Sequence, residues 1–530
     1  MAQKTFLREA TGLVRDFGTI DALLFAIGAI IGPFWVVGFS SEWYLFPGVN
    51  IPASLIIVSF LGLANGVYYI LITSVIPRSA GGSYGALSRA VHPLLGMVMS
   101  LIFSAGLLLN IGFIADITFS VGIASPLTSY ATVTGNTGLA SLATTLATPT
   151  VVFGIGTVFI VLIALIAAAG TRAIILANKI AFVVGTAGIL ALIGILVTTT
   201  TAHFQTVVNG FAGSNVYQNI TSTAPAVGMK IPSSWVEPTI LSLPVSFFII
   251  LGYAFNTYYA GEIRRVTRSM TIAVVGAIIF AGGFFSLLAW LMEYSFGSNF
   301  IVAANYLFNE APSKYPLSIA PYVNSLAALV DSNPLVNILI MANFVAWGYF
   351  LIINFIFIPS RNFLAYSMDG VFPARLGAVS DRYHSPVVSI AVCSLIGIGA
   401  LAFLVYLPTV GGAVNVTYLI IGGTALDGLA GVALVLRKKR TFEEAPPIAK
   451  KKVAGIPVIA ILGAYSVVFI LSLIALALFN PVIIGPLGLV TDVTTMLAIL
   501  VAVVSYFGMK QYNKRRGIDV NLAFKEIPPE

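Results

Sequence analysis

Charged side chains are scarce in this 530-residue chain, where Asp, Glu, Lys and Arg together make up 9% of the residues. A soluble domain carries about 25%, so this scarcity excludes an ordinary water-soluble protein. The single cysteine, Cys393, excludes an intrachain disulfide, and we expect it to be a packed small residue. The three histidines, His92, His203 and His384, fall in loops, so they predict neither a metal site nor a proton relay at membrane depth.

Long apolar runs dominate the chain instead, and hydrophobic residues make up 58% of it. Twelve runs are long enough to cross the roughly 30 Å of hydrocarbon in a bilayer: residues 19–40, 50–75, 94–122, 151–170, 175–199, 241–261, 271–293, 335–359, 386–407, 413–436, 455–479 and 486–508. The sequence therefore predicts an all-α membrane protein with twelve transmembrane helices. No short apolar segment with a small-residue cleavage site precedes the first run, so we expect that span to be retained.

The basic residues predict the orientation of these spans. When the N-terminus is placed in the cytoplasm, all but two of the 27 lysines and arginines fall on the cytoplasmic side, and the exceptions are Lys230 and Lys314. Cytoplasmic loops are enriched in basic residues, so we expect a multi-pass protein of the cell membrane with both termini in the cytoplasm. The net charge of +8 sits in these short loops, where contact with anionic lipid explains it, and no nucleic-acid binding is expected.

Two spans that lie five spans apart are interrupted near their middle. The first contains Gly28, Gly32 and Pro33, and the sixth contains Pro244 and Gly252. Backbone freed from helical hydrogen bonds is tolerated inside a membrane only next to protein or a water-filled cavity. Paired interruptions are typical of transporters built from inverted repeats, with the substrate site between the repeats. We therefore expect two broken helices, one and six, that cross at mid-membrane.

The interruptions also divide the chain into units. An odd number of spans per repeat inverts the second repeat against the first, which gives a 5+5 arrangement. The predicted units are a cytoplasmic N-terminal tail at 1–18, a first repeat at 19–199, an extracellular loop at 200–240, an inverted second repeat at 241–437, a cytoplasmic linker at 438–454, helices 11 and 12 at 455–510, and a cytoplasmic C-terminal tail at 511–530. We expect the loop to pack as an irregular cap and the linker to be flexible.

Four segments of the sequence have a recognisable pattern. They are GAIIG at Gly28–Gly32, IPRSAGGSYGALSRAVHPLLG at Ile76–Gly96, GYAFNTYYAGEIRRVTR from Gly252, and SRNFLAYSMDGVFPARL at Ser360–Leu376. Together they resemble the amino acid-polyamine-organocation (APC) superfamily of permeases, in particular its amino acid permease branch. The likeness extends over roughly residues 15–440.

The resemblance implies a LeuT-like 5+5 inverted repeat and transport of an amino acid or related amine by alternating access. A zwitterion fits such a site, because its carboxylate suits the positive end of a half-helix and its ammonium suits freed carbonyls. The resemblance further implies an aromatic gate at Phe248 and Phe355. The substrate-site candidates are Gly28, Ala29, Ile31, Gly32 and Pro33 on the carboxylate side, the carbonyls of Phe248, Ile249 and Leu251 on the amine side, and Asn110, Gly252, Tyr253 and Phe355.

The chain departs from the family pattern at Pro33 and Phe34, where relatives usually have Ser or Thr followed by Gly. Proline has no N–H and phenylalanine adds bulk. We therefore expect a binding site for the substrate carboxylate that is weaker, shifted or suited to another head group. The alternative is that Pro33 only kinks an apolar helix. Ala254 replaces an acid found in many relatives, and the aromatic residues around it favour neutral over cationic substrates.

Ionisable residues inside spans are costly and often functional. The deepest are Asp116 in span three and Asp427 in span ten, and both are candidates for proton coupling. The alternative for each is a helix–helix hydrogen bond. Asn110 and Asn354 have the same alternatives, and the structural one is favoured for both.

Several functions are weighed against transport of neutral amino acids by proton coupling or exchange. Sodium coupling is disfavoured, because span eight has no Ser or Thr between Asn343 and Pro359. An enzyme is not expected, since no span holds a nucleophile with an acid–base partner. An amino acid sensor of the same fold, and a carrier of a polyamine or small organic ion, stay as alternatives. The predicted partners are a small-molecule substrate, the lipid bilayer and protons, with no cofactor and no metal; the oligomeric state is left open.

Overall fold

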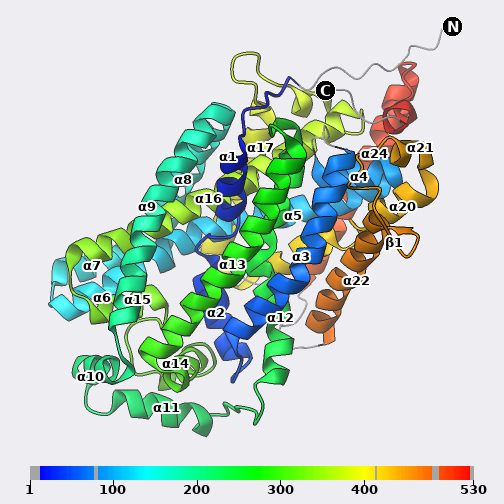
Figure 1. Cartoon of the computed structure of the whole chain (residues 1–530). Coiled ribbons are helices and arrows are strands. Elements are labelled where there is room, and N and C mark those ends of the chain that lie inside the picture. The colour runs from blue at the N-terminus through cyan, green and yellow to red at the C-terminus, as the bar shows by residue number, and fades with distance from the viewer. Residues whose placement is uncertain (1–11, 77–80, 412–414, 480–488, 526–530) are drawn as a thin grey trace.

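The computed structural model is a bundle of helices (Figure 1). It describes residues 12–76, 81–411, 415–479 and 489–525. Lys4, Arg8 and Arg78, which the orientation prediction used, lie outside the described residues, as do residues 77–80 of the second motif and the outer parts of both tails. Among the described residues, eleven helices are long and apolar enough to cross a membrane. The prediction of an all-α membrane protein is therefore confirmed.

The first half of the chain provides the first broken helix and the spans that follow it. Its elements are α1 (Thr19–Gly28), α2 (Phe34–Leu45), α3 (Ile51–Val75), α4 (Gly82–Ala90), α5 (Pro93–Phe119), the π-helix η1 (Ser120–Ala124), α6 (Ser125–Thr134), α7 (Thr137–Leu146), α8 (Pro149–Ala168) and α9 (Thr171–Thr198). Side-chain caps start three of them: Asn50 accepts a hydrogen bond from the N–H of Ala53 at α3, His92 accepts one from Leu94 at α5, and Asn136 accepts one from Leu139 at α7. The span at α5 runs on through η1 and α6 to Thr134, well past its expected end at 122.

The segment between the halves is helical, so the prediction of an irregular cap was wrong. It forms α10 (Thr201–Ala212) and α11 (Val216–Ala226). The hydroxyl of Thr200 accepts a hydrogen bond from the N–H of His203 and caps α10. Phe204 of α10 is buried and packs against Phe296 and Phe300. A few apolar residues at helical spacing are enough to dock these polar helices on their neighbours.

The second half repeats the pattern of an interrupted helix followed by long spans. Its elements are α12 (Val236–Ile250), the 3-10 helix η2 (Leu251–Glu262), α13 (Val266–Phe296), α14 (Ser298–Glu310), η3 (Pro312–Lys314), α15 (Val323–Val330), α16 (Pro334–Met368), η4 (Ala374–Gly377), α17 (Val387–Tyr406), α18 (Pro408–Gly411), α19 (Val416–Thr424) and α20 (Leu429–Arg437). The sixth span, which was expected to be broken near Gly252, is not unwound there; the α-helix tightens into η2. The tenth span is broken at residues 425–428, which the sequence did not predict.

The remaining elements cover one side of the bundle. They are α21 (Lys439–Glu443), the strands β1 (Lys452–Val453) and β2 (Ile456–Pro457), α22 (Val458–Phe479), α24 (Leu489–Arg515) and η5 (Val520–Phe524). The strands pair antiparallel, with Lys452 opposite Pro457. The linker that was expected to be flexible therefore contains a short helix and a hairpin.

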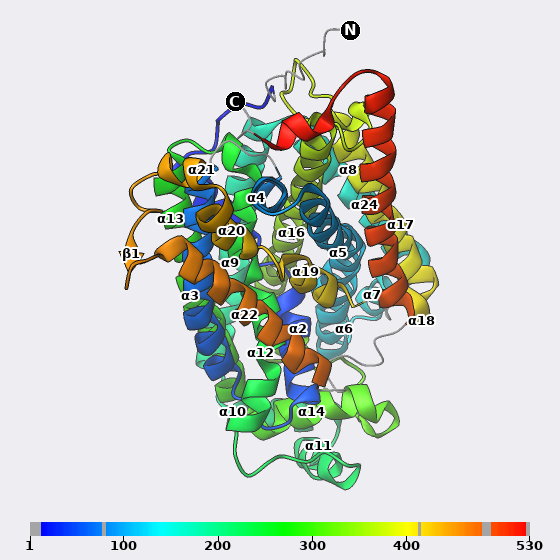
Figure 2. The same ribbon diagram turned by 90° about the vertical axis from the view of Figure 1, so that its right-hand side faces the viewer.

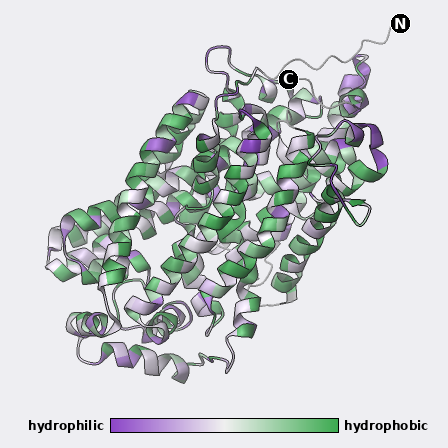
Figure 3. Ribbon diagram, viewed as in Figure 1, coloured by the Kyte–Doolittle hydropathy of each residue, from purple (hydrophilic) through white to green (hydrophobic). Residues whose placement is uncertain are grey.

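The two ends of the bundle differ in what they carry. The first and last described segments lie at one end, which we call the termini end, and α10, α11 and α14 lie at the other (Figures 1 and 2). Apolar residues dominate the long helices between, and hydrophilic residues are prominent around α21 (Figure 3). In the most apolar window of each span, 78% of Val236–Glu262 is buried against 22% of Val490–Arg515. The interrupted sixth span therefore lies at the centre of the bundle and α24 at its edge.

Candidate functional site

The break between α1 and α2 lies against the start of η2. A Cβ atom on Gly252 would overlap the carbonyl oxygen of Ala29, so only glycine allows the two backbones to approach this closely. Asn256 of η2 donates a hydrogen bond of 3.3 Å to the carbonyl oxygen of Ala22 on α1. The two interrupted segments are thus held together by backbone contact deep in the bundle.

A central cavity of about 370 Å³ opens beside this contact. Its lining residues come from the α1–α2 break, α5, α12, η2, α16 and α19: Ala29, Ile30, Phe34, Asn110, Phe248, Ile249, Leu251, Gly252, Phe255, Leu351, Phe355 and Ile420. Asn110 is the single polar side chain among them. It is 1% exposed, and its Oδ1 atom accepts no hydrogen bond within the described part of the chain. This amide is therefore available to a polar group of a ligand.

Phenylalanine rings form much of the cavity wall. Phe34 meets Phe248 edge to face, with ring centroids 4.7 Å apart. Phe255 lies 6.4 Å from Phe355 and 5.7 Å from Phe103 on α5. Aromatic walls of this kind suit an apolar ligand side chain.

Not all of the predicted site residues reach the cavity. The structure brings together seven of them: Ala29, Asn110, Phe248, Ile249, Leu251, Gly252 and Phe355. The other five, Gly28, Ile31, Gly32, Pro33 and Tyr253, do not line this cavity. Gly28 packs against the ring of Phe350 and Gly32 against Leu351, both on α16. These glycines let helices approach each other.

Pro33 and Tyr253, two of these five residues, have structural roles. Pro33 precedes the first residue of α2 as its N-cap. The hydroxyl of Tyr253 donates a hydrogen bond of 2.6 Å to Asn65 on α3. Sequence reasoning did not single out Ile30, Leu351 and Ile420, which are ordinary apolar residues of spans, so no signal in the letters distinguishes them from lipid-facing residues. Phe34 was noted as a departure from the family pattern, and Phe255 is one of the aromatic residues around Ala254, but neither was named as a wall residue.

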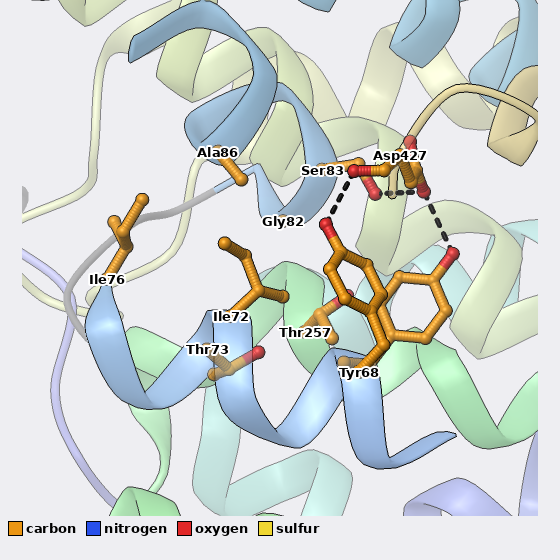
Figure 4. A pocket seen from close by; sticks show the side chains of 10 residues that line it. Tyr68, Ile72, Thr73, Ile76, Gly82, Ser83, Ala86, Thr257 and Asp427 are labelled. Atoms are coloured by element: carbon orange, nitrogen blue, oxygen red, sulfur yellow. Dashed lines mark hydrogen bonds between the residues drawn. The ribbon is translucent and has the colours of Figure 1, made fainter. Parts of the chain in front are cut away.

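A second cavity of about 350 Å³ lies between α3, α4, η2 and the break in span ten (Figure 4). Its lining residues are Tyr68, Tyr69, Ile72, Thr73, Ile76, Gly82, Ser83, Ala86, Thr257 and Asp427. Asp427 is 2% exposed and accepts hydrogen bonds at Oδ2 from Tyr69 (2.9 Å) and Ser83 (2.5 Å). The other proposed proton-coupling acid, Asp116, is half-buried on α5 and lines neither cavity.

Ion pairs and backbone hydrogen bonds join the segments at the termini end. Arg361 of α16 pairs with Glu262 at the end of η2, with an Nε–Oε1 distance of 2.9 Å, and both side chains are buried. Breaking a buried pair by removing one partner costs about 3–5 kcal/mol. Phe17 joins this cluster through backbone hydrogen bonds to Glu262 and Arg264. The N-terminal segment is thus attached to the same element that lines both cavities.

A bundle of apolar helices around a buried cavity is the architecture of a membrane transporter. The model of the amino acid permease family matches residues 17–505, nearly the whole chain. The chain belongs to this family, which is part of the APC superfamily, and it is therefore a transporter rather than an enzyme. A comparison with curated proteins found no match.

Proposed function

We propose that the chain is a secondary active transporter of the cell membrane that moves neutral amino acids or related amines by alternating access. The observation that carries this proposal is the central cavity, which combines apolar walls with a single unpaired polar side chain, Asn110. An apolar side chain of the substrate fits the phenylalanine walls. A cationic side chain would have no carboxylate to meet there, and burying it unpaired is unfavourable.

The proposed fold is a LeuT-like 5+5 inverted repeat with twelve spans. In it, α1 and α2 together form the first span, which precedes the eleven long spans. Contacts between counterparts five spans apart support the repeat: α1 contacts η2, α3 contacts α13, α5 contacts α16, and α8 contacts α17. The proposed repeats comprise residues 19–199 and 241–437. Both termini are proposed to be cytoplasmic, which agrees with their position at one end of the bundle (Figure 2).

The proposed substrate lies beside the contact between Ala29 and Gly252. Its ammonium group binds the Oδ1 atom of Asn110 and the carbonyls of Phe248, Ile249 and Leu251. Its carboxylate faces the α1–α2 break, where Pro33 provides no N–H. This arrangement gives the carboxylate fewer backbone donors than the usual family sequence would.

The proposed driving force is a proton gradient, with exchange of substrates as the alternative mode. A carboxyl that changes charge between inward and outward states can link proton movement to substrate movement, because a population shift needs a differential interaction with the two states. Asp116 and Asp427 are the proposed groups, and at least one of them is needed.

Uptake into liposomes tests the proposal. The purified chain is reconstituted, and uptake of each labelled neutral amino acid is measured with and without an inward proton gradient, against empty liposomes. We expect gradient-dependent accumulation of at least one of them. Binding without uptake would support a sensor, and uptake of polyamines alone would support the cationic alternative.

Cysteine labelling tests the proposed orientation. In a Cys393→Ala background, single substitutions Lys230→Cys and Lys450→Cys should react with a membrane-impermeant reagent from opposite sides. Labelling of both from the same side would contradict the topology.

A further inference from the structure

The second cavity lies at the break in span ten, and this break does not line the central cavity. Span ten breaks at residues 425–428, and Asp427 lies in this break. Gly428, next to it, packs so closely against the carbonyl of Gly463 on α22 that a Cβ atom would collide. Non-helical backbone in a span is tolerated where it is buried in protein or lines a cavity. Here it is buried against α22 and presents a carboxyl to a cavity.

The carboxyl of Asp427 has neutral partners only. Tyr69 and Ser83 both donate to Oδ2, and Tyr68 donates to the backbone carbonyl of Asp427 at 2.5 Å. The Oδ1 atom is buried and accepts no hydrogen bond, and no lysine or arginine pairs with this carboxyl among the described residues. A buried carboxyl of this kind attracts a cation, because it lacks an opposite charge of its own.

The adjoining wall of the cavity is the start of α4, where Ser83 donates its hydrogen bond to Oδ2 of Asp427. Gly82 and Ser83 are the first two residues of this nine-residue helix, and both line the cavity with Ala86 (Figure 4). The N-terminus of a helix carries a partial positive charge and presents backbone N–H groups, so it suits a carboxylate. The cavity therefore offers one wall to an ammonium group and another to a carboxylate.

A single element, η2, separates the two cavities. Phe255 of η2 lines the central cavity, and Thr257 lines the second. Next to them Tyr258 stacks on Phe103, with centroids 5.0 Å apart, and its hydroxyl donates to Ser83 at 3.2 Å. A 3-10 helix has weaker hydrogen-bond geometry than an α-helix and often marks a hinge.

We propose that the second cavity is a second substrate site, in which Asp427 binds the ammonium group and the start of α4 binds the carboxylate of a neutral amino acid. The substrate class rests on the proposed transport function. In this proposal η2, which lines both cavities through Phe255 and Thr257, lies between the two sites.

Binding stoichiometry tests this site directly. Equilibrium binding of labelled L-alanine to the purified full-length chain should saturate at two molecules per chain. Asp427→Asn should reduce this to one, and so should Ala86→Leu, which fills the second cavity without changing a charge. Ile30→Trp fills the central cavity and should also leave one, while the double variant Ile30→Trp/Asp427→Asn should bind none. Asp492→Asn, an exposed carboxyl on α24, is the matched control and should keep two.

The outcomes separate this inference from the proposed function. Saturation of the unmodified chain at one molecule, removed by Ile30→Trp but not by Asp427→Asn, would overturn the second site and leave transport through the central cavity intact. Two molecules in Asp427→Asn and in Ala86→Leu, with each variant folded by its thermal melting curve, would also overturn it. Gradient-driven uptake that is absent for every neutral amino acid, while L-alanine still binds in a manner that depends on Asp427, would instead contradict the proposed function.

Discussion

The two cavities share η2 as part of their walls but differ in their polar side chains. Phenylalanine and aliphatic residues line the first, with Asn110 as its single polar side chain. The second combines apolar residues such as Ile72 and Ile76 with several hydroxyl groups and the carboxyl of Asp427. Two adjacent sites in one protein can therefore divide recognition, the first selecting by shape and apolar contact and the second by the charges common to all amino acids.

This division follows from what each kind of contact contributes. Burial of apolar surface contributes about 25 cal/mol per Å² and depends on the substrate's side chain. Burial of an unpaired carboxyl is unfavourable by itself. Pairing with an ammonium group is therefore favourable whatever side chain the substrate carries. Substitutions in the first cavity should therefore alter selectivity, and substitutions in the second should weaken all substrates alike.

The largest effect is expected where the backbones of the two broken segments touch. In Gly252→Ala the new methyl group meets the carbonyl of Ala29, so one backbone must shift beside the central cavity. We expect initial uptake into liposomes to fall by about a hundredfold, as small displacements at a functional site often do. Gly283→Ala on α13 is the control, since no atom lies within 4 Å of the new methyl group. Equal uptake by both variants would show that the close contact is dispensable.

Loss of the carboxyl of Asp427, which is proposed to couple protons, is expected to have the next largest effect. Asp427→Asn keeps the size and an acceptor oxygen but cannot exchange a proton, so pH-driven accumulation should fall to passive equilibration, a loss of about tenfold or more. The measurement is the steady-state ratio of internal to external substrate under a pH gradient. Asp116→Asn is measured in parallel. Full accumulation in both variants would contradict proton coupling through these acids and favour exchange.

A smaller, substrate-dependent effect is expected at Asn110. Asn110→Leu keeps the number of side-chain heavy atoms and removes the one polar side chain of the central cavity, which leaves the ammonium group short of one acceptor. We expect about a tenfold rise in the KM for uptake with little change in the maximal rate. The control is Ala105→Leu, which places a leucine at a half-buried position of the same helix that lines neither cavity. A fall in maximal rate at unchanged KM would assign Asn110 to helix packing instead.

The sequence predicted the features that depend on whether a segment lies in lipid or in water. Apolar length located the long spans, and glycine with proline located the α1–α2 break, because both respond directly to the membrane. The extension of span three over Ser125–Thr134 was missed, since these small polar residues are stabilised by α15 rather than by lipid. The break at Asp427 was missed for a similar reason, because the close fit of Gly428 to Gly463 is visible only in the packed structure.

The candidate site residues show the same difference between features that local sequence determines and features that packing between helices determines. Ala29 and Gly252 could be found because a helix break marks its own position in the sequence. Gly28 and Gly32 belong to the same break but face α16, and the side to which a residue points is set by packing between helices. Ser83 and Tyr69 were not singled out at all, since a hydroxyl in a span gains meaning only when a carboxyl such as Asp427 lies beside it.

Glu42 can be compared with Asp427, because it is a second buried carboxyl without a cationic partner among the described residues. It lies on α2, is fully buried, and accepts a hydrogen bond of 2.7 Å from Ser246 on α12. Ser246 in turn contacts Ser54 on α3 at 2.7 Å. Unlike Asp427, Glu42 lines neither of the two cavities. Burial and lack of an ion pair are thus shared by the two acids, and the adjoining cavity is what differs.

The smallest effect is therefore expected for Glu42→Gln. Glutamine keeps the carbonyl oxygen that accepts from Ser246, and its amide fills the same space, so the contact between α2, α3 and α12 is preserved. Neither substrate cavity adjoins Glu42 to admit a head group. We expect uptake, KM and the accumulation ratio to stay within about twofold of the unmodified chain, because the helix–helix hydrogen bond is retained. A loss of accumulation as large as that of Asp427→Asn, in a variant with an unchanged melting temperature, would mean that burial of an unpaired carboxyl is sufficient for coupling and that the cavity beside Asp427 is not the deciding difference.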